Sequence, residues 1–115
     1  MQRIITSHFL SIYLANVNWP HDVKARPALI MSRTVNNFKV FRITSKFPTQ
    51  KSRQIGKNYL VIEQWKLAGL NRPSCIDTTR LYLINSQYIM QRAPLGKLTA
   101  LDIERLFQFL FDKRR

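Results

Sequence analysis

Apolar and polar residues alternate along residues 13–19 of the chain. The apolar side chains occupy the odd positions from Tyr13 to Trp19, and Asn16 and Asn18 fall between them. A period of two residues is typical of a strand with one buried face. We therefore predict a strand over residues 13–19 that ends at Pro20.

A second strand is predicted over residues 28–32, which are apolar at nearly every position. A continuous apolar run of this length indicates a strand that is covered on both faces. Asn36 and Asn37 tolerate the positive φ angles of a tight turn. We expect this turn to lead into a third strand over residues 38–44, so that the two strands form a hairpin.

The middle of the chain is less regular. Residues 45–58 combine basic residues with Pro48 and Gly56, which predicts a basic surface loop. We expect a fourth strand over residues 59–63, a turn at residues 68–71, and short strands near residues 74–78 and 80–84. Residues 85–97 show no clear pattern.

The end of the chain predicts a helix over residues 100–111. Thr99 and Asp102 have the spacing of a capping box, and Leu98 with Ile103 has the spacing of a hydrophobic staple. Apolar residues on one helical face should lie against the sheet: Ile103, Leu106, Phe107 and Leu110.

Several short strands, turn signals and one terminal helix indicate a mostly β protein. The expected architecture is a small twisted antiparallel sheet or partly open barrel with the helix packed on it. With 115 residues, of which 45% are hydrophobic, the chain is long enough for a single domain over residues 1–115. Residues 1–9 form an N-terminal extension to which we assign no element.

Cysteine and hydropathy patterns bear on location. The single Cys75 excludes an internal disulfide framework, and its place beside Ile76 predicts a buried structural thiol. No stretch approaches the ~20 apolar residues that span a bilayer, and polar residues interrupt the apolar run near the N-terminus. These features predict a cytoplasmic protein with no membrane role.

The charge balance is strongly positive. Nineteen Lys and Arg against six Asp and Glu give a formal net charge of +13, which favours an acidic partner, either nucleic acid or an acidic protein. Between Asp22 and Glu63 the basic residues have no acidic counterpart: Lys24, Arg26, Arg33, Lys39, Arg42, Lys46, Lys51, Arg53 and Lys57. We expect this set to form one basic face, the alternative being an ordinary solvated surface.

Several kinds of chemistry are disfavoured by composition. The six carboxylates are dispersed, which argues against paired-carboxylate catalysis. One cysteine and two histidines show no metal-ligand spacing, and three glycines form no phosphate loop, so no metal or cofactor is expected. One reaction that needs neither a metal nor paired carboxylates is the cleavage of RNA by attack of a ribose 2′-hydroxyl on the adjacent phosphate. That reaction needs positive charge and proton transfer.

Arg26 directly precedes Pro27 at the start of the second strand. A guanidinium can hold two phosphate oxygens and stays charged at any working pH. Pro27 keeps the preceding backbone extended, so the side chain of Arg26 would project from a rigid backbone. The alternative is that Arg26 simply protects a strand edge against aggregation. His21 titrates near neutrality and would be a better proton carrier than an arginine, unless it is a bystander in its loop.

The stretch Arg26-Pro27-Ala28-Leu29-Ile30 resembles the RPA-hydrophobic motif of the PemK/MazF toxins, the ribonuclease halves of bacterial toxin–antitoxin pairs. Further stretches resemble the family in the same order, from residue 12 to about residue 110: Ile12 to Val17, Ile43-Thr44-Ser45, Trp65 with Ala68-Gly69-Leu70 and Pro73-Ser74, and Gly96 to Thr99 with Asp102-Ile103.

The resemblance implies an SH3-like antiparallel barrel of the CcdB/PemK type that forms a homodimer and is silenced by an acidic antitoxin. It implies an endoribonuclease that cuts single-stranded RNA without metal and leaves 2′,3′-cyclic phosphate and 5′-hydroxyl ends. By position, Arg26 resembles the catalytic arginine and Thr44 the threonine beside it, whereas the residues alone favour a Thr44 hydroxyl that bonds its own backbone. The expected RNA contacts are His21, Lys24, Ser45, Lys46, Lys51 and Arg53.

The chain also departs from the family pattern. The family opens its first strand with Gly followed by Asp or Glu, where this chain has Leu10 and Ser11, and residues 19–26 form a short loop. The alternative function is therefore a basic binding protein without catalysis: an RNA-binding barrel, a degenerate toxin, or a gyrase-binding toxin like CcdB. Four aromatic residues could stack on RNA bases or belong to the core: Tyr13, Trp19, Phe41 and Phe47.

Overall fold

The computed structural model describes residues 8–16, 25–46 and 58–113. Its elements in chain order are β1 (Ser11–Ala15), β2 (Arg26–Arg33), β3 (Asn37–Thr44), β4 (Tyr59–Val61), β5 (Cys75–Asn85), α2 (Ser86–Met90), β6 (Gly96–Lys97) and α3 (Ala100–Lys113). The strands form one antiparallel sheet in the order β4-β5-β3-β2-β1-β6. A mostly β fold with a C-terminal helix is thus confirmed.

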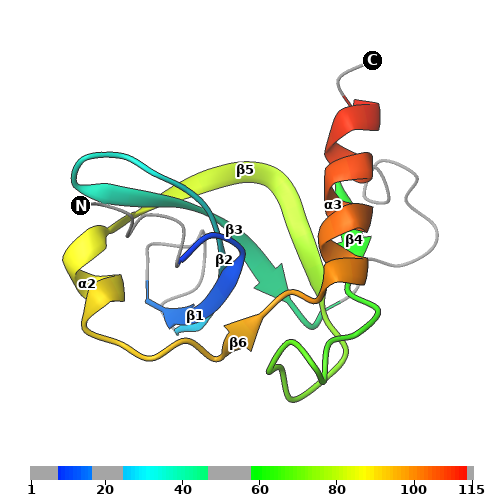
Figure 1. The fold of residues 1–115 in the computed structure, drawn as a ribbon, viewed down its shortest axis with the longest axis horizontal. Helices are drawn as coiled ribbons and strands as arrows, with labels where there is room; N and C mark the ends of the chain where they lie inside the picture. The colour runs from blue at the N-terminus through cyan, green and yellow to red at the C-terminus, as the bar shows by residue number, and fades with distance from the viewer. Residues whose placement is uncertain (1–7, 17–24, 47–57, 114–115) are drawn as a thin grey trace.

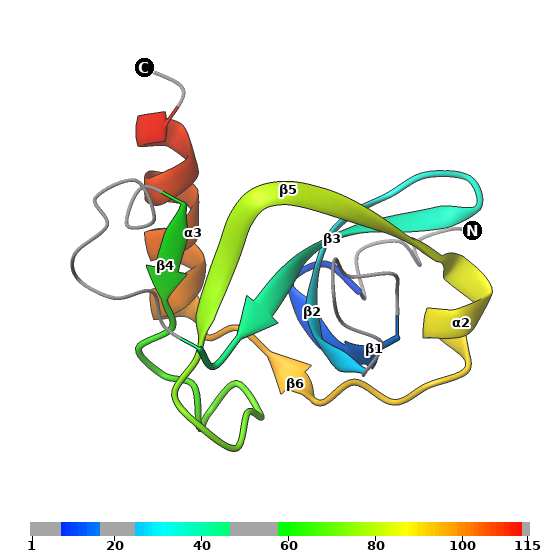
Figure 2. The same ribbon diagram turned by 180° about the vertical axis from the view of Figure 1, so that it is seen from behind.

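Among the described strands, β4 and β6 lie at the two edges, so the sheet is open rather than closed on itself. Figure 1 and the reverse view in Figure 2 show β5 arching over the molecule from α2 at one end to β4 and α3 at the other. None of the helices in the described ranges is long and apolar enough to cross a membrane.

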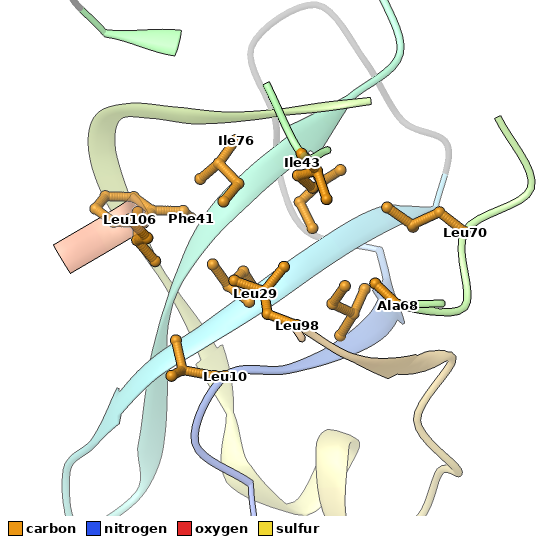
Figure 3. Packing of buried hydrophobic residues seen from close by; sticks show 11 residues of the cluster. Leu10, Leu29, Phe41, Ile43, Ala68, Leu70, Ile76, Leu98 and Leu106 are labelled. Carbon is orange, nitrogen blue, oxygen red and sulfur yellow. The ribbon is translucent and has the colours of Figure 1, made fainter. Parts of the chain in front are cut away.

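The sheet carries a hydrophobic core on each face. The core on the α3 side, called the α3 core, comprises Leu10, Ile12, Leu29, Phe41, Ile43, Ile62, Ala68, Leu70, Ile76, Leu98 and Leu106 (Figure 3). The core on the α2 side, the α2 core, comprises Tyr13, Ala15, Ala28, Ile30, Phe38, Val40, Ile84 and Ile89.

Strand β2 contributes to both cores. Successive side chains of a strand point to opposite faces, so Ala28 and Ile30 enter the α2 core while Leu29 enters the α3 core. This confirms the expectation that the apolar run of the second strand is covered on both faces. β1 starts at Ser11, earlier than predicted, and it is buried on both faces and not on one, since Ile12 and Tyr13 enter different cores. Residues 17–19 lie outside the described residues.

The predicted hairpin joins β2 to β3, but its turn is built differently from the expectation. The Thr34 N–H donates to the carbonyl of Asn37 (2.7 Å), and the Asn37 N–H donates to Oγ1 of Thr34 (3.2 Å). Among the described non-glycine residues only Leu10 has a positive φ, so the predicted left-handed asparagines are wrong. The Thr34 hydroxyl closes the turn where left-handed backbone was expected.

Strand β5 replaces the two short strands predicted near residues 74–78 and 80–84. Between the pairs Val40↔Tyr82 and Arg42↔Asp77, β3 advances by two residues and β5 by five. The unmatched residues of β5 form an irregularity of the bulge type, which bends a strand without ending it. The break in the sequence pattern marks this bend.

Residues 85–97, for which the sequence showed no pattern, contain α2 and β6. The side chain of Asn85 accepts a hydrogen bond from the Gln87 N–H (2.9 Å) and caps α2. Strand β6 pairs with β1 through Ser11↔Lys97 and Ile12↔Gly96. Two paired residues are too few to show a period of two.

Helix α3 begins as the capping box predicts, because Oγ1 of Thr99 accepts the Asp102 N–H (3.4 Å). Ile103, Leu106 and Leu110 face the α3 core. Phe107, predicted on the same face, is 45% exposed and stacks on the ring of Phe9, with 6.2 Å between centroids. Phe107 lies at the edge of the apolar face of α3 and is not one of the helix residues that pack against the α3 core.

The side chain of Asp102 also holds the segment that follows β4. Its Oδ1 accepts the Glu63 N–H (3.0 Å), and its Oδ2 accepts the Gln64 N–H (2.8 Å). β4 ends at Val61, before the predicted residue 63. The Ile62 N–H still donates to the Ser74 carbonyl (3.0 Å), but the Glu63 and Gln64 amides bond to α3 and not to a strand.

Candidate functional site

A pocket of about 550 Å³ opens where β2 starts and β3 ends. In Figures 1 and 2 the tip of β3, strand β6 and the turn between β4 and β5 come together in this region. The pocket is lined by Leu14, residues 25–27, residues 42–46, residues 69–72, Ser74 and Leu95. Of the expected site residues, Arg26, Thr44, Ser45 and Lys46 are brought together here.

Arg26 and Thr44 lie at a fork between two strands. The paired residues of β2 and β3 run from Arg33↔Phe38 to Ala28↔Arg42. Beyond this pair, Arg26 lies opposite Ala15 of β1, whereas Thr44 lies opposite Cys75 of β5. By strand alternation Arg26 shares a face with Ala28, and Thr44 with Arg42, so both side chains belong to the same face of the sheet.

Pro27 fits the fork because it has no N–H to donate. It pairs with Leu14 of β1 and lies beyond the last β2–β3 pair. A proline at this place removes no bond from that ladder and keeps the backbone of Arg26 extended. The side chain of Arg26 is half-buried at the pocket.

The hydroxyl of Thr44 accepts a hydrogen bond from the Lys46 N–H (3.1 Å). This is the strand-end backbone bond that the residues alone favour. A threonine hydroxyl that accepts one bond still has its own O–H to donate. Ser45 and Lys46, on the turn fixed by this bond, are exposed at the pocket.

Four of the described lining residues are basic and none is acidic: Arg26, Arg42, Lys46 and Arg72. Arg72 was not predicted as a site residue. The sequence does carry a signal for it, since Arg72-Pro73 repeats the arginine–proline pair of Arg26-Pro27. A proline disfavours helical backbone for the residue before it, and both arginines line the same pocket.

Arg42 is paired with a carboxylate, contrary to the expectation of uncompensated charges. Its Nη2 lies 2.8 Å from Oδ2 of Asp77, which is 6% exposed and also accepts the Thr79 N–H at Oδ1 (2.9 Å). Burial raises the pKa of Asp77, but the bonds from Thr79 and Arg42 outweigh it and leave the pKa below its ordinary value. Burial, with the charge of Asp77, raises the pKa of Tyr59, which lies opposite Asp77 on β4.

In the described part of the chain, the expected basic residues are spread along the sheet and do not all gather at the pocket. Arg33 and Lys39 lie at the hairpin end of β2 and β3, whereas Arg26 and Arg42 lie at the fork. Seven residues of extended strand separate Arg26 from Arg33, or about 23 Å. The guanidinium of Arg33 covers the Phe38 ring instead, at 5.3 Å from its centroid.

Four expected RNA contacts, His21, Lys24, Lys51 and Arg53, lie outside the described residues, as does Lys57 of the basic run. Tyr13 and Phe41 are buried core residues and not stacking platforms. The other two aromatic candidates, Trp19 and Phe47, also fall outside the described ranges.

One wall of the pocket depends on two glycines. Gly69 has a φ of 94°, in the left-handed region that favours glycine. A Cβ on Gly69 would overlap the carbonyl of Leu95, and a Cβ on Gly96 would overlap the carbonyl of Ala68. This contact fixes the turn of residues 68–71 against β6. Next to it, the Leu95 N–H donates a hydrogen bond to the carbonyl of Ile12 in β1 (2.7 Å).

The single cysteine is buried and does not line the pocket. Cys75 is 1% exposed, and burial raises the pKa of its thiol to about 11, as expected for a structural cysteine. Within residues 8–16, 25–46 and 58–113, no three His, Cys, Asp or Glu side chains gather so that they could hold a metal.

No family model matches this chain, and no curated protein matches it in sequence. The likeness to the PemK/MazF toxins therefore rests on the short motifs alone. One departure from that pattern has a structural counterpart: Leu10, at the position of the family's glycine, has a φ of 64°. Its backbone thus adopts the conformation that glycine accommodates most readily.

Proposed function

We propose that this chain is the toxin of a type II toxin–antitoxin pair, a metal-independent endoribonuclease that acts on single-stranded RNA in the cytoplasm. The observation that carries the proposal is the convergence of Arg26 and Thr44 on one pocket whose described lining is basic and free of carboxylates. Such a pocket favours a phosphodiester over a neutral or cationic ligand.

In the proposed reaction, the 2′-oxygen of a ribose attacks the adjacent phosphorus and the bond from phosphorus to the 5′-oxygen breaks. The 2′-hydroxyl proton passes to a base, and the departing 5′-oxygen takes up a proton. The guanidinium of Arg26 stabilises the doubly charged phosphorane through two hydrogen bonds. The O–H of Thr44 donates to a phosphate oxygen, and His21 is the proposed proton carrier.

The proposal extends to the fold and its partners. An SH3-like barrel is a finer description of the bent sheet, supported by the order of the motifs and by the left-handed φ of Leu10 where the family has glycine. A homodimer and an acidic antitoxin follow from the same resemblance. The net charge of +13 suits an acidic partner segment.

The test is to incubate the purified protein with a long single-stranded RNA in EDTA and to analyse the ends of the fragments. Fragments that carry 2′,3′-cyclic phosphate and 5′-hydroxyl groups are the expected result. Intact RNA together with tight RNA binding would instead indicate a non-catalytic RNA-binding protein. Capture of a topoisomerase without RNA binding at physiological salt would indicate a gyrase-binding toxin.

A further inference from the structure

The side chain of Arg42, which lines the pocket, is held by a buried carboxylate. Its Nη2 bonds Oδ2 of Asp77 at 2.8 Å, and Asp77 is itself fixed by the Thr79 N–H at 2.9 Å. Asp77 is 6% exposed, whereas the side chain of Arg42 keeps 27% exposure and lines the pocket. The carboxylate therefore acts as a buried anchor, and the guanidinium is the group that solvent and ligands can reach.

The hydrogen bonding of Arg42 is incomplete within the described chain. Its Nε is buried and has no hydrogen-bond partner among the described residues. Buried donors are nearly always satisfied in native proteins, so this exception calls for a physical explanation. Because Nε is buried, a ligand in the pocket can reach only the exposed part of the guanidinium. Held rigidly at a basic pocket, that part is suited to an oxyanion with several acceptor oxygens.

The distance between Arg42 and Thr44 along β3 indicates which oxyanion Arg42 would bind. Arg42 and Thr44 are two residues apart on one strand and share a face, so their Cα atoms are about 6–7 Å apart. Consecutive phosphates of a single RNA strand are separated by a comparable distance. A strand with its cleaved phosphate at Arg26 and Thr44 would therefore bring a neighbouring phosphate to Arg42.

We propose that Arg42 binds the phosphate next to the one that is cut, and that Asp77 is its positioning residue. This inference rests on the proposed ribonuclease function and specifies its substrate. The substrate is an oligoribonucleotide with at least two consecutive charged phosphates. Asp77 cancels the charge of Arg42 at long range. Arg42 therefore contributes to RNA binding through direct contact with the phosphate and contributes little to the long-range attraction of RNA.

The experiment neutralises one phosphate at a time. RNA oligonucleotides that contain a single cleavage site are made with a methylphosphonate, an uncharged linkage, either just 5′ or just 3′ of the cut. For the wild-type protein, one of the two substitutions is expected to lower kcat/KM about ten-fold, the loss of a charge-assisted hydrogen bond. The double variant Arg42→Gln/Asp77→Asn leaves no buried carboxylate unpaired. Its kcat/KM should differ less than two-fold between the charged RNA and the same methylphosphonate RNA.

Two further variants separate contact from folding. Lys39→Gln removes a positive charge from the far end of β3 and should keep the ten-fold sensitivity of the wild type. Asp77→Asn removes the anchor and should give an intermediate sensitivity. The ratio between the charged and uncharged RNA does not depend on how much protein is folded, so a merely structural role of Asp77 would leave it at the wild-type value.

The outcomes distinguish the inference from the proposed function. A wild-type protein that cuts none of the RNAs contradicts the proposed function and this inference with it. If the wild type cuts RNA and is insensitive to both uncharged linkages, only the inference about Arg42 is overturned. The same holds if the double variant keeps the full ten-fold sensitivity.

Discussion

The backbone of Gly69 lies directly against that of Gly96, so that a Cβ on either residue would overlap a carbonyl group of the opposing segment. Gly69 belongs to the turn that follows β4, and Gly96 opens β6. Their contact ties the pocket wall of residues 69–72 to the edge of the sheet. The shape of the pocket therefore depends on two residues that carry no functional group.

Gly96→Ala should destabilise the protein because its methyl group would overlap the Ala68 carbonyl. Forcing the two segments apart should lower the free energy of unfolding by about 1–3 kcal/mol. Urea denaturation followed by circular dichroism measures this change. The neighbouring substitution Lys97→Ala, at an exposed position of the same strand, is the control and should change stability by less than about 0.5 kcal/mol. Equal stability of the two variants would show that the contact is loose.

Asp102→Ala should be more damaging than a typical helix-cap substitution. The carboxylate is 1% exposed and accepts bonds from the Glu63 and Gln64 amides and from Nη1 of Arg105 (2.7 Å). Its loss leaves two part-buried amides without an acceptor, so we expect about 2–4 kcal/mol of destabilisation. Thermal unfolding of Asp102→Ala beside Glu104→Ala, an exposed acidic residue of the same helix, provides the comparison. Similar melting temperatures would contradict the anchoring role.

The contribution of Asp77 should depend on pH in a defined direction. Its pKa in the folded protein lies below the ordinary value of 3.8, so folding favours the charged form. The resulting stabilisation is fully present above pH 3.8 and disappears as the pH falls through the lower folded pKa. The stability difference between wild type and Asp77→Asn, measured by denaturation at neutral pH and at pH values below 3.8, should therefore shrink at the acidic end. A difference that stays constant or grows on acidification would contradict the depressed pKa.

Local signals in the sequence predicted local structure well. The Thr99–Asp102 capping box marked the start of α3, and the apolar run at Ala28–Ile30 indicated a strand covered on both faces. The arginine–proline pair placed Arg26 at the start of β2. Each of these features depends on neighbours within a few residues.

Features that depend on pairing between distant segments could not be predicted in this way. The fork beyond Ala28↔Arg42, the salt bridge from Arg42 to Asp77 and the place of Arg72 in the pocket all result from strand register and the bend of β5. The same holds for Asp102, which the sequence identified as a helix cap and the structure shows to be an anchor for the turn after β4. A one-residue change in register would move every such side chain to the other face of the sheet.

The most direct test of the central claim compares two arginines at opposite ends of β2. Arg26→Ala and Arg33→Ala remove the same charge from the same strand, but only Arg26 lines the pocket with Thr44. Rates of cleavage of a single-stranded RNA in EDTA should fall at least about a hundred-fold for Arg26→Ala, as for other groups that stabilise charge in a transition state, and by less than a few-fold for Arg33→Ala. Unchanged cleavage by Arg26→Ala, or an equal loss in the two variants, would contradict the assignment of the pocket as the catalytic site.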